Sequence, residues 1–254
     1  MILLLGGTSD TPPIALRLAA DGYRVLVSRA TDVPLETGHH PNIESRSGQL
    51  DEHSLGELVE RRGIRAIVDA THPYAVTIRA AAGRVAKDKG LPYLCFVRPA
   101  AVEPATPGVE MAADHPSAAV AAFGRGRPVL LTTGTRNLAP YATQARRTEL
   151  PLVARVLDRP QSLEACLRAG IPREHILVGR GPFSVDDNRR HLRDFRIGVL
   201  VTKDSGAAGG VVEKLEAARA ENCHVVVVAR PALGNHQAIA DVDRLIEALA
   251  AALL

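Results

Sequence analysis

Length, composition and charge exclude several classes of protein. The chain has 254 residues, of which 46% are hydrophobic and 23% are charged, and this balance is typical of a globular protein with one large domain or two small ones. The net charge is +3, and 3% of the residues are aromatic, with no tryptophan. A disordered chain, a coiled coil and a nucleic-acid-binding surface with stacking platforms are therefore not expected.

The sequence carries no signal for a membrane or for an oxidising compartment. No apolar run approaches the roughly 18 residues of a membrane span, and the strand-like run at residues 2–5 lacks a signal-peptide pattern. The three cysteines, Cys95, Cys166 and Cys223, have no Cys-x-x-Cys spacing and are expected to be small buried side chains. We expect a cytoplasmic protein without a metal site; the sequence leaves its oligomeric state open.

In chain order, short apolar runs alternate with helical patterns. The expected strands cover residues 2–5, 23–27, 66–68, 93–97, 129–131, 152–156, 175–178, 197–201 and 223–229. The expected helices cover residues 13–20, 55–62, 75–89, 117–123, 162–169, 186–195, 211–220 and 241–254. Continuous apolar strands that are followed by helices are typical of parallel strands buried on both faces, so the predicted class is α/β.

A proline-rich stretch divides this pattern near its middle. Residues 98–116 show neither helical nor strand periodicity, which is typical of a linker. We predict two Rossmann-like domains with parallel sheets and a cleft between them. Residues 1–107 are expected to bind a cofactor and residues 108–254 a substrate, with the C-terminal helix free to pack back on the first domain.

The first strand leads directly into a glycine-rich turn. Gly6 and Gly7 allow a close backbone approach, and the helix that follows would offer N–H groups to an anion. Thr11 stands where the dinucleotide-binding pattern Gly-x-Gly-x-x-Gly has its last glycine. The residues expected to bind phosphate are Gly6, Gly7, Thr8 and Ser9. The alternative is an ordinary strand–helix turn with Asp10 as the helix N-cap.

The second strand ends with Ser28 and Arg29 and has no acid at its end. NAD enzymes usually place an acid there for the ribose hydroxyls, whereas a basic or hydroxyl side chain suits the 2′-phosphate of NADPH. We therefore predict NADPH rather than NADH as the cofactor. The alternative is that Arg29 is an ordinary surface side chain.

A run of polar residues from Thr71 to Tyr74 follows the strand at residues 66–68. Pro73 favours an extended backbone at His72, and burying such groups at a strand end is unfavourable unless they have partners. We predict that Thr71, His72 and Pro73 contact the cofactor and that His72 is a candidate catalytic residue. A structural or capping role for His72 is the alternative.

Three strand ends in the second half also present hydroxyl groups, backbone N–H groups and cations. These segments begin at Thr132, Gly179 and Thr202, and such a rim suits an anion, above all a carboxylate. Lys203 follows a continuous apolar strand and is the main candidate for a catalytic or carboxylate-binding cation. Asp204 is a second catalytic candidate, unless it only pairs with Lys203 or caps the next helix.

Six motifs occur in order along the chain: LLLGGTSD, VDATHPYA, LPYLCFVRP, LLTTGTRNL, ILVGRGPFS and TKDSGAAGG. Together they resemble the precorrin-6A reductase family of cobalamin biosynthesis over essentially the whole chain. The resemblance implies a two-domain Rossmann-like fold and an NADPH-dependent reduction of one carbon–carbon double bond of a tetrapyrrole-derived corrinoid macrocycle, precorrin-6A to precorrin-6B. The cofactor residues that it implies are Gly6, Gly7, Thr8, Ser9, Ser28, Thr71, His72 and Pro73. The substrate residues that it implies are Arg98, Gly134, Thr135, Arg136, Ser184, Lys203, Asp204, Ser205 and Gly206.

Two other functions stay open from the residues alone. One is an S-adenosylmethionine-dependent methyltransferase of tetrapyrrole biosynthesis, against which the lack of an acid after the second strand argues. The other is a nucleotide-sensing module without catalysis, which would not need the polar rim of the second half. For the reduction itself, the sequence leaves His72, Tyr74, Lys203, Asp204 and water as proton donors, and it leaves open whether the substrate contains cobalt.

Overall fold

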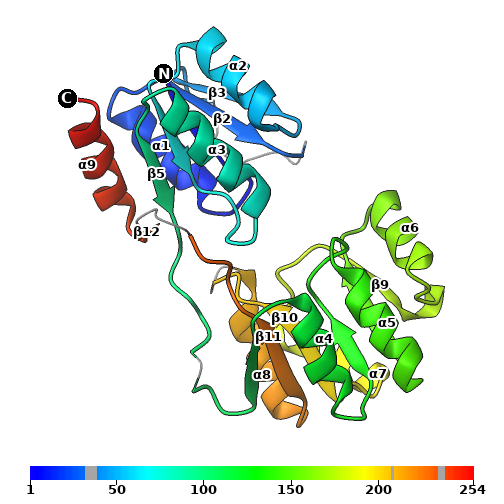
Figure 1. Cartoon of the computed structure of the whole chain (residues 1–254). Helices are drawn as coiled ribbons and strands as arrows, with labels where there is room; N and C mark the ends of the chain where they lie inside the picture. The colour runs from blue at the N-terminus through cyan, green and yellow to red at the C-terminus, as the bar shows by residue number, and fades with distance from the viewer. Residues whose placement is uncertain (32–38, 104, 207–208, 234–237) are drawn as a thin grey trace. The chain divides into compact units, whose positions relative to one another are not determined.

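The computed structural model describes residues 1–31, 39–103, 105–206, 209–233 and 238–254. The chain forms two compact units, one made of Met1–Pro99 with Pro231–Leu254 and the other of Ala100–Arg230 (Figure 1). Each unit contains a six-stranded sheet in which all paired strands run parallel. The predicted α/β class with two Rossmann-like parallel sheets is confirmed.

The sheet of the first unit has the strand order β12-β5-β4-β1-β2-β3. Its elements are β1 (Ile2–Leu5), α1 (Thr11–Ala20), β2 (Val25–Arg29), β3 (Ile43–Ser47), α2 (Glu52–Arg62), β4 (Ala66–Asp69), α3 (Val76–Asp88), β5 (Tyr93–Phe96), β12 (Ala238–Ile239) and α9 (Val242–Ala252). The direction in which successive strands are added reverses between β1 and β4. In doubly wound sheets, ligands bind at the carboxyl ends of the strands at such a reversal.

The side chains of β1 show why this strand is apolar throughout. Ile2 and Leu4 belong to a buried cluster with residues of α1 and α9, whereas Leu3 and Leu5 belong to a cluster with residues of α2 and α3. Successive side chains of a strand point to opposite faces. Helices therefore cover both faces of the first sheet. Every side chain of β1 is buried, which explains why all four are apolar.

The sheet of the second unit has the order β6-β11-β10-β7-β8-β9, and its strand order reverses between β7 and β10. Its elements are β6 (Val109–Ala112), α4 (His115–Phe123), β7 (Val129–Leu131), α5 (Leu138–Thr148), β8 (Leu152–Val156), α6 (Pro160–Arg168), the 3₁₀ helix η1 (Arg173–His175), β9 (Ile176–Val178), α7 (Val185–Asp194), β10 (Val199–Lys203), α8 (Val211–Ala220) and β11 (His224–Val228). Apolar residues of β8, β10 and β11 pack with α7 and α8 in its core.

The second sheet is formed by consecutive strands, β6 to β11, whereas the first sheet takes its sixth strand, β12, from a segment that follows them all. β6 comes after β5 in sequence but pairs with β11, and β12 comes after β11 but pairs with β5. Leu245 and Leu249 of α9 then join the core of the first unit. The sequence placed the domain boundary between residues 107 and 108; the units divide after Pro99 and after Arg230, because these pairings decide to which sheet each strand belongs.

Three strands and one α-helix were missed from the sequence, as was the short 3₁₀ helix η1. β3 is an edge strand with a polar sequence, which an edge tolerates because one side of it is open. β6 lies in the stretch interpreted as a linker, and β12 has only two residues. α5 has Pro140 in its first turn, where a missing N–H breaks no helical hydrogen bond.

Candidate functional site

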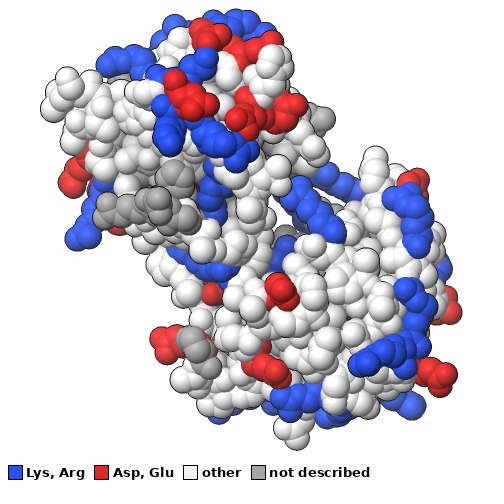
Figure 2. All heavy atoms as spheres, in the orientation of Figure 1, with Lys and Arg blue, Asp and Glu red and all other residues white. Residues whose placement is uncertain are grey.

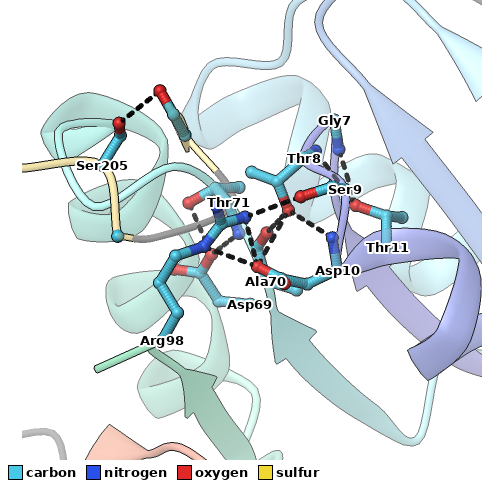
Figure 3. Close-up of polar contacts among 12 residues, drawn as sticks. Gly7, Thr8, Ser9, Asp10, Thr11, Asp69, Ala70, Thr71, Arg98 and Ser205 are labelled. Carbon is cyan, nitrogen blue, oxygen red and sulfur yellow. Dashed lines mark hydrogen bonds and ion pairs between the residues drawn. The ribbon is translucent and has the colours of Figure 1, made fainter. Parts of the chain in front are cut away.

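The carboxyl edge of the first sheet carries two polar segments side by side. β1 runs into the turn at residues 6–10, and β4 runs into residues 70–75; Leu5 at the end of β1 is in register with Asp69 at the end of β4. The Thr8 hydroxyl donates to the carbonyl of Ala70 at 3.2 Å, which joins the two segments (Figure 3). The residues predicted around phosphate and around His72 therefore lie on neighbouring strand ends.

The turn after β1 is shaped by Thr11. A Cβ on Gly6 would lie 2.3 Å from Thr11 Cγ2, so only glycine fits there, and Gly7 has a φ of +116°. The buried Thr11 hydroxyl accepts the N–H groups of Gly7 at 3.0 Å and Thr8 at 3.2 Å. Pro12 and Pro13 then open α1 without N–H groups. A phosphate at this turn would therefore be bound by the hydroxyl groups of Thr8 and Ser9. Few backbone N–H groups of α1 would contribute, because Pro12 and Pro13 have none.

Arg98, predicted to bind substrate, lies on this turn. Its Nε donates to Asp10 Oδ2 at 2.9 Å and its Nη2 donates to Ser9 Oγ at 3.3 Å (Figure 3). Asp10 occupies the N-cap position of α1, but its side chain makes no capping hydrogen bond and instead forms an ion pair with Arg98. The guanidinium thus adds a cation beside the hydroxyl groups of the turn.

A buried carboxylate holds the segment that follows β4. Asp69 is fully buried and its Oδ1 accepts the N–H and the hydroxyl of Thr71 at 2.9 and 2.6 Å. Its Oδ2 accepts Tyr93 Oη at 2.6 Å and Arg79 Nε at 3.2 Å, and Arg79 also donates to the carbonyl of Pro73 at 3.0 Å. Burial, and next the charge of Asp69, raise the pKa of Tyr93. This network fixes the backbone from Thr71 to Pro73.

His72 and Tyr74 lie close together at the end of that segment. The N–H of Tyr74 is 3.3 Å from His72 Nδ1, and the two ring centroids are 5.5 Å apart. A neutral His72 that accepts at Nδ1 carries its proton on Nε2. His72 is therefore held by its own loop.

A basic residue of the neighbouring strand β3, Arg46, lies beside the carboxyl end of β2 and was not predicted from the sequence. Arg46 of β3 is in register with Ser28 of β2, and its Nη1 donates to Ser28 Oγ at 2.7 Å and to the carbonyl of Gly48 at 3.2 Å. Burial, and next the charge of Arg61, lower the pKa of Arg46. Only the pairing of β2 with β3 places Arg46 here, and that pairing could not be seen because β3 was not recognised.

In the second unit, Lys203 ends β10 at the reversal of strand order. Burial, and next the charge of Arg136, lower the pKa of Lys203 to about 8, so the structure brings these two predicted substrate residues near each other. The predicted rim also includes Gly134, which has a φ of +81°, and the neighbouring Thr133, which is buried with a hydroxyl that has no hydrogen-bond partner among the described residues.

Asp204 has a different set of partners from those expected. It is buried and accepts the N–H groups of Ala101 at 3.2 Å and Gly206 at 3.0 Å, and Arg230 Nη2 at 3.1 Å. Arg230 also donates to the Asp204 carbonyl at 2.9 Å. These bonds join both ends of the second unit to the end of β10, which indicates a positioning role for Asp204.

Two other predicted residues serve their own loops. Ser184 caps α7: its hydroxyl accepts the N–H of Asp187 at 3.0 Å and donates to the Asp187 carboxylate at 2.7 Å. Ser205 donates to the carbonyl of Gly209 at 3.2 Å. Their backbone groups stay at the carboxyl edge of the sheet, whereas their hydroxyl groups already have partners.

A histidine near Lys203 was also missed. His115 opens α4, and its Nδ1 lies 2.9 Å from the hydroxyl of the fully buried Tyr141. Burial, and next the charge of Lys203, lower the pKa of His115 to about 4. His115 is thus neutral at physiological pH. This pair could not be predicted, because neither β6, which precedes His115, nor α5, which carries Tyr141, was recognised in the sequence.

Other kinds of site receive no support from the described residues. They contain no group of three His, Cys, Asp or Glu side chains that could hold a metal ion. None of the helices formed by these residues is long and apolar enough to cross a membrane. On the face drawn in Figure 2, Lys and Arg side chains are interspersed with Asp and Glu. All three cysteines are buried and unpaired with one another.

The two sheets define an α/β protein of the doubly wound type, with a glycine-containing polar turn after the first strand and cations at the edge of the second sheet. A family model described as precorrin-6x reductase CbiJ/CobK matches residues 1–250. The chain belongs to this family of reductases, and membership implies a nicotinamide cofactor.

Individual relatives agree with this assignment. A precorrin-6A reductase of Mycobacterium tuberculosis (strain H37Rv) is 36% identical over 244 residues, which cover 91% of this chain and 89% of the relative. A cobalt-precorrin-6A reductase of Priestia megaterium is 29% identical over 250 residues, 98% of each chain. A solved structure described as CobK precorrin-6A reductase has a TM-score of 0.79 at 26% identity and covers 98% of this chain and 96% of its own. The comparisons support a reductase and neither the methyltransferase nor the sensor alternative.

Proposed function

We propose that the protein reduces one carbon–carbon double bond of precorrin-6A with NADPH, giving precorrin-6B in cobalamin biosynthesis. The observation that carries this proposal is the family match over residues 1–250, together with two sheet edges of different chemistry in one chain. The edge of the first unit has the phosphate-type turn, and the edge of the second has the cations and hydroxyl groups that suit carboxylates. We assign the cofactor to the first unit and the substrate to the second, in place of the 1–107 and 108–254 division.

The first unit fits a phosphorylated dinucleotide. The missing Cβ at Gly6 and the open left-handed backbone at Gly7 allow a close approach at the end of β1. Thr8, Ser9 and Arg98 would hold the diphosphate, and the segment from Thr71 to Pro73, fixed by Asp69, would contact the nicotinamide half. Ser28, Arg29 and Arg46 would hold the 2′-phosphate, and this set favours NADPH over NADH because β2 itself ends with Ser28 and Arg29 rather than with a carboxylate.

The second unit fits a carboxylated macrocycle. Lys203 and Arg136 supply two cations near each other, and the loop at Gly134 and Thr135 supplies backbone N–H groups at the same edge. The backbones of Ser184, Ser205 and Gly206 extend this rim. A substrate with several acid side chains can therefore be bound at its periphery by ion pairs and hydrogen bonds.

Bound NADPH supplies the hydride for one carbon of the double bond. The chain then has to deliver a proton to the neighbouring carbon, and we propose Lys203 as its source. With its pKa lowered to about 8, the Lys203 ammonium is protonated near neutral pH and loses its proton more readily than an ordinary lysine. Asp204 positions the end of β10, and the Nε2 hydrogen of His72 remains an alternative donor on the cofactor side.

The test is an anaerobic reaction of the purified protein with precorrin-6A and either NADPH or NADH. We expect NADPH oxidation to match formation of a product that is heavier by one hydride and one proton. Parallel reactions with the cobalt-containing macrocycle decide between the two substrate forms that the names of the relatives describe. Failure to oxidise NADPH with either macrocycle would refute the proposed function.

A further inference from the structure

A buried arginine outside the predicted site has unusual surroundings. Arg155 lies near the carboxyl end of β8 and is 6% exposed. Its Nη1 donates to Asn188 Oδ1 at 2.8 Å and lies 3.3 Å from His191 Nδ1, and the Phe183 ring centroid is 4.1 Å from its Cζ. All of these partners are uncharged groups or a histidine; no carboxylate among the described residues forms an ion pair with Arg155.

The hydrogen bonds of Arg155 leave one edge of its guanidinium without protein acceptors. Among the described residues, neither Nε nor Nη2 has a hydrogen-bond partner, because every bond of this side chain is made by Nη1. Nε and Nη2 together form the side-on pair of donors that matches the two oxygens of a carboxylate. Asn188 and Phe183 hold the guanidinium plane so that this edge is fixed in direction.

A second cation lies near Arg155. Burial, and next the charge of Arg155, lower the pKa of Lys214 to about 8, and the Lys214 ammonium donates to the carbonyl of Gly209 at 3.3 Å. Lys214 stands in the first turns of α8, where the helix dipole disfavours a cation. Glu213 precedes it, but its buried Oε2 has no hydrogen-bond partner among the described residues and forms no ion pair with Lys214.

The start of α8, which carries Lys214, lies against the loop that carries Phe183. A Cβ on Gly210, the N-cap of α8, would lie 3.3 Å from Pro182 Cβ, so the start of α8 touches the loop that carries Phe183. The other titratable groups nearby are His191, whose pKa is lowered by burial and then by Arg155, and Asp187, which is bound to Ser184 and Arg190. The charge of Asp187 acts on Arg155 and that of Glu213 acts on Lys214, and each partly opposes the lowering of the pKa by burial. Neither carboxylate forms an ion pair with its cation, so an anion that joins the two desolvated cations would stabilise them.

We propose that Arg155 and Lys214, with the Phe183 ring over the guanidinium, form a carboxylate-binding subsite for a peripheral acid group of the substrate. Arg155 binds the carboxylate side-on through Nε and Nη2, and Lys214 adds a second positive charge. The identity of the ligand depends on the proposed function, whereas the preference for a carboxylate follows from the donor geometry. β7 lies between β8, which carries Arg155, and β10, which ends with Lys203, so Arg155 would hold a different part of the macrocycle from Lys203.

The test measures equilibrium binding of precorrin-6A in the presence of NADP⁺, so that no turnover occurs. Arg155→Met should raise the dissociation constant about 10- to 100-fold, as expected for a lost charge-assisted pair, and Lys214→Met should raise it about 3- to 10-fold. Binding of NADP⁺ should be unchanged in both. Arg193→Gln is the control, since it removes a charge from α7 whose guanidinium pairs with Glu221 at 2.7 Å.

A second measurement separates carboxylate binding from a structural role. With the acid groups of precorrin-6A converted to methyl esters, the wild type should lose affinity, whereas Arg155→Met should discriminate between acid and ester by about tenfold less. In turnover, KM should rise while kcat stays within about twofold. Equal discrimination by both proteins, or wild-type affinity in both variants, would overturn the subsite. A wild type that neither binds nor reduces precorrin-6A would instead refute the proposed function. Should Arg155→Met fail to fold, Arg155→Lys and Lys214→Met give the same comparison.

Discussion

We expect the proposed preference for NADPH to depend on Arg46, and replacing this residue by methionine tests it. The guanidinium is held at the end of β2 by Ser28 Oγ at 2.7 Å, which places it where the 2′-phosphate of a bound cofactor would lie. A hydrogen bond to a charged group contributes about 1.5–3 kcal/mol. Because Arg46 is half-buried and partly screened by solvent, we take the lower half of this range, which corresponds to an affinity change of about 10- to 40-fold.

The assay is a fluorescence titration of NADPH and of NADH with each protein. Arg46→Met should weaken NADPH binding by that factor and change NADH binding by less than about threefold, since NADH has no 2′-phosphate. The preference of the wild type should shrink as salt increases. Arg24→Gln is a matched control, because Arg24 precedes the other end of β2 and pairs with Glu44 at 3.0 Å. An unchanged ratio of the two affinities in Arg46→Met would refute the reasoning.

Three further predictions concern the two sheet edges. Lys203→Met should lower kcat about 100-fold. In the wild type, kcat should fall as pH rises through about 8, where the Lys203 ammonium loses its proton, and this fall should be absent from the variant. A pH–rate profile with wild-type shape in the variant would contradict the proton-donor role. Asp69→Asn should lower the free energy of unfolding in urea by about 3–5 kcal/mol, because it leaves the buried charge of Arg79 without its carboxylate; a loss below about 1 kcal/mol would show that the pair is not needed. Gly6→Ala should destabilise by about 1–3 kcal/mol and weaken NADPH binding, because the new Cβ meets Thr11; the double variant with Thr11→Ala should recover part of both losses, and no recovery would place the cause elsewhere.

The strands at the centres of the sheets could be predicted because each is buried on both faces. β1, β4 and β10 therefore consist almost entirely of apolar residues, and such runs are visible in a sequence. β3 has one neighbour and half-exposed side chains, so its sequence resembles a loop. β12 is a strand only because Ala238 and Ile239 meet β5, and no local pattern specifies that contact.

The same distinction applies to the site. Gly6 and Thr71 come shortly after β1 and β4, and Lys203 ends β10, so their position at the carboxyl edges could be predicted from the apolar runs before them. The contacts of Arg46 and Arg155 arise from strand pairing and from a helix that packs on the sheet. Such contacts depend on residues far apart in the chain, and the sequence showed these two arginines only as single basic residues without a partner.

The strand order also explains why a single boundary in the linker does not describe the two units: they divide after Pro99, within that stretch, and a second time after Arg230. The chain forms β1 to β5 of the first sheet, then all six strands of the second sheet, β6 to β11, and only then β12, the sixth strand of the first sheet. A cut after residue 107 would leave the first unit without β12 and without the Leu245 and Leu249 side chains that pack on Ile2 and Leu4. Ile2 and Leu4 of β1 stand near the start of the sequence, and the residues of α9 that cover them stand near its end. The core of the first unit is thus made from residues near both ends of the given sequence. The proline-rich stretch that resembles a boundary contains β6, a strand of the second sheet.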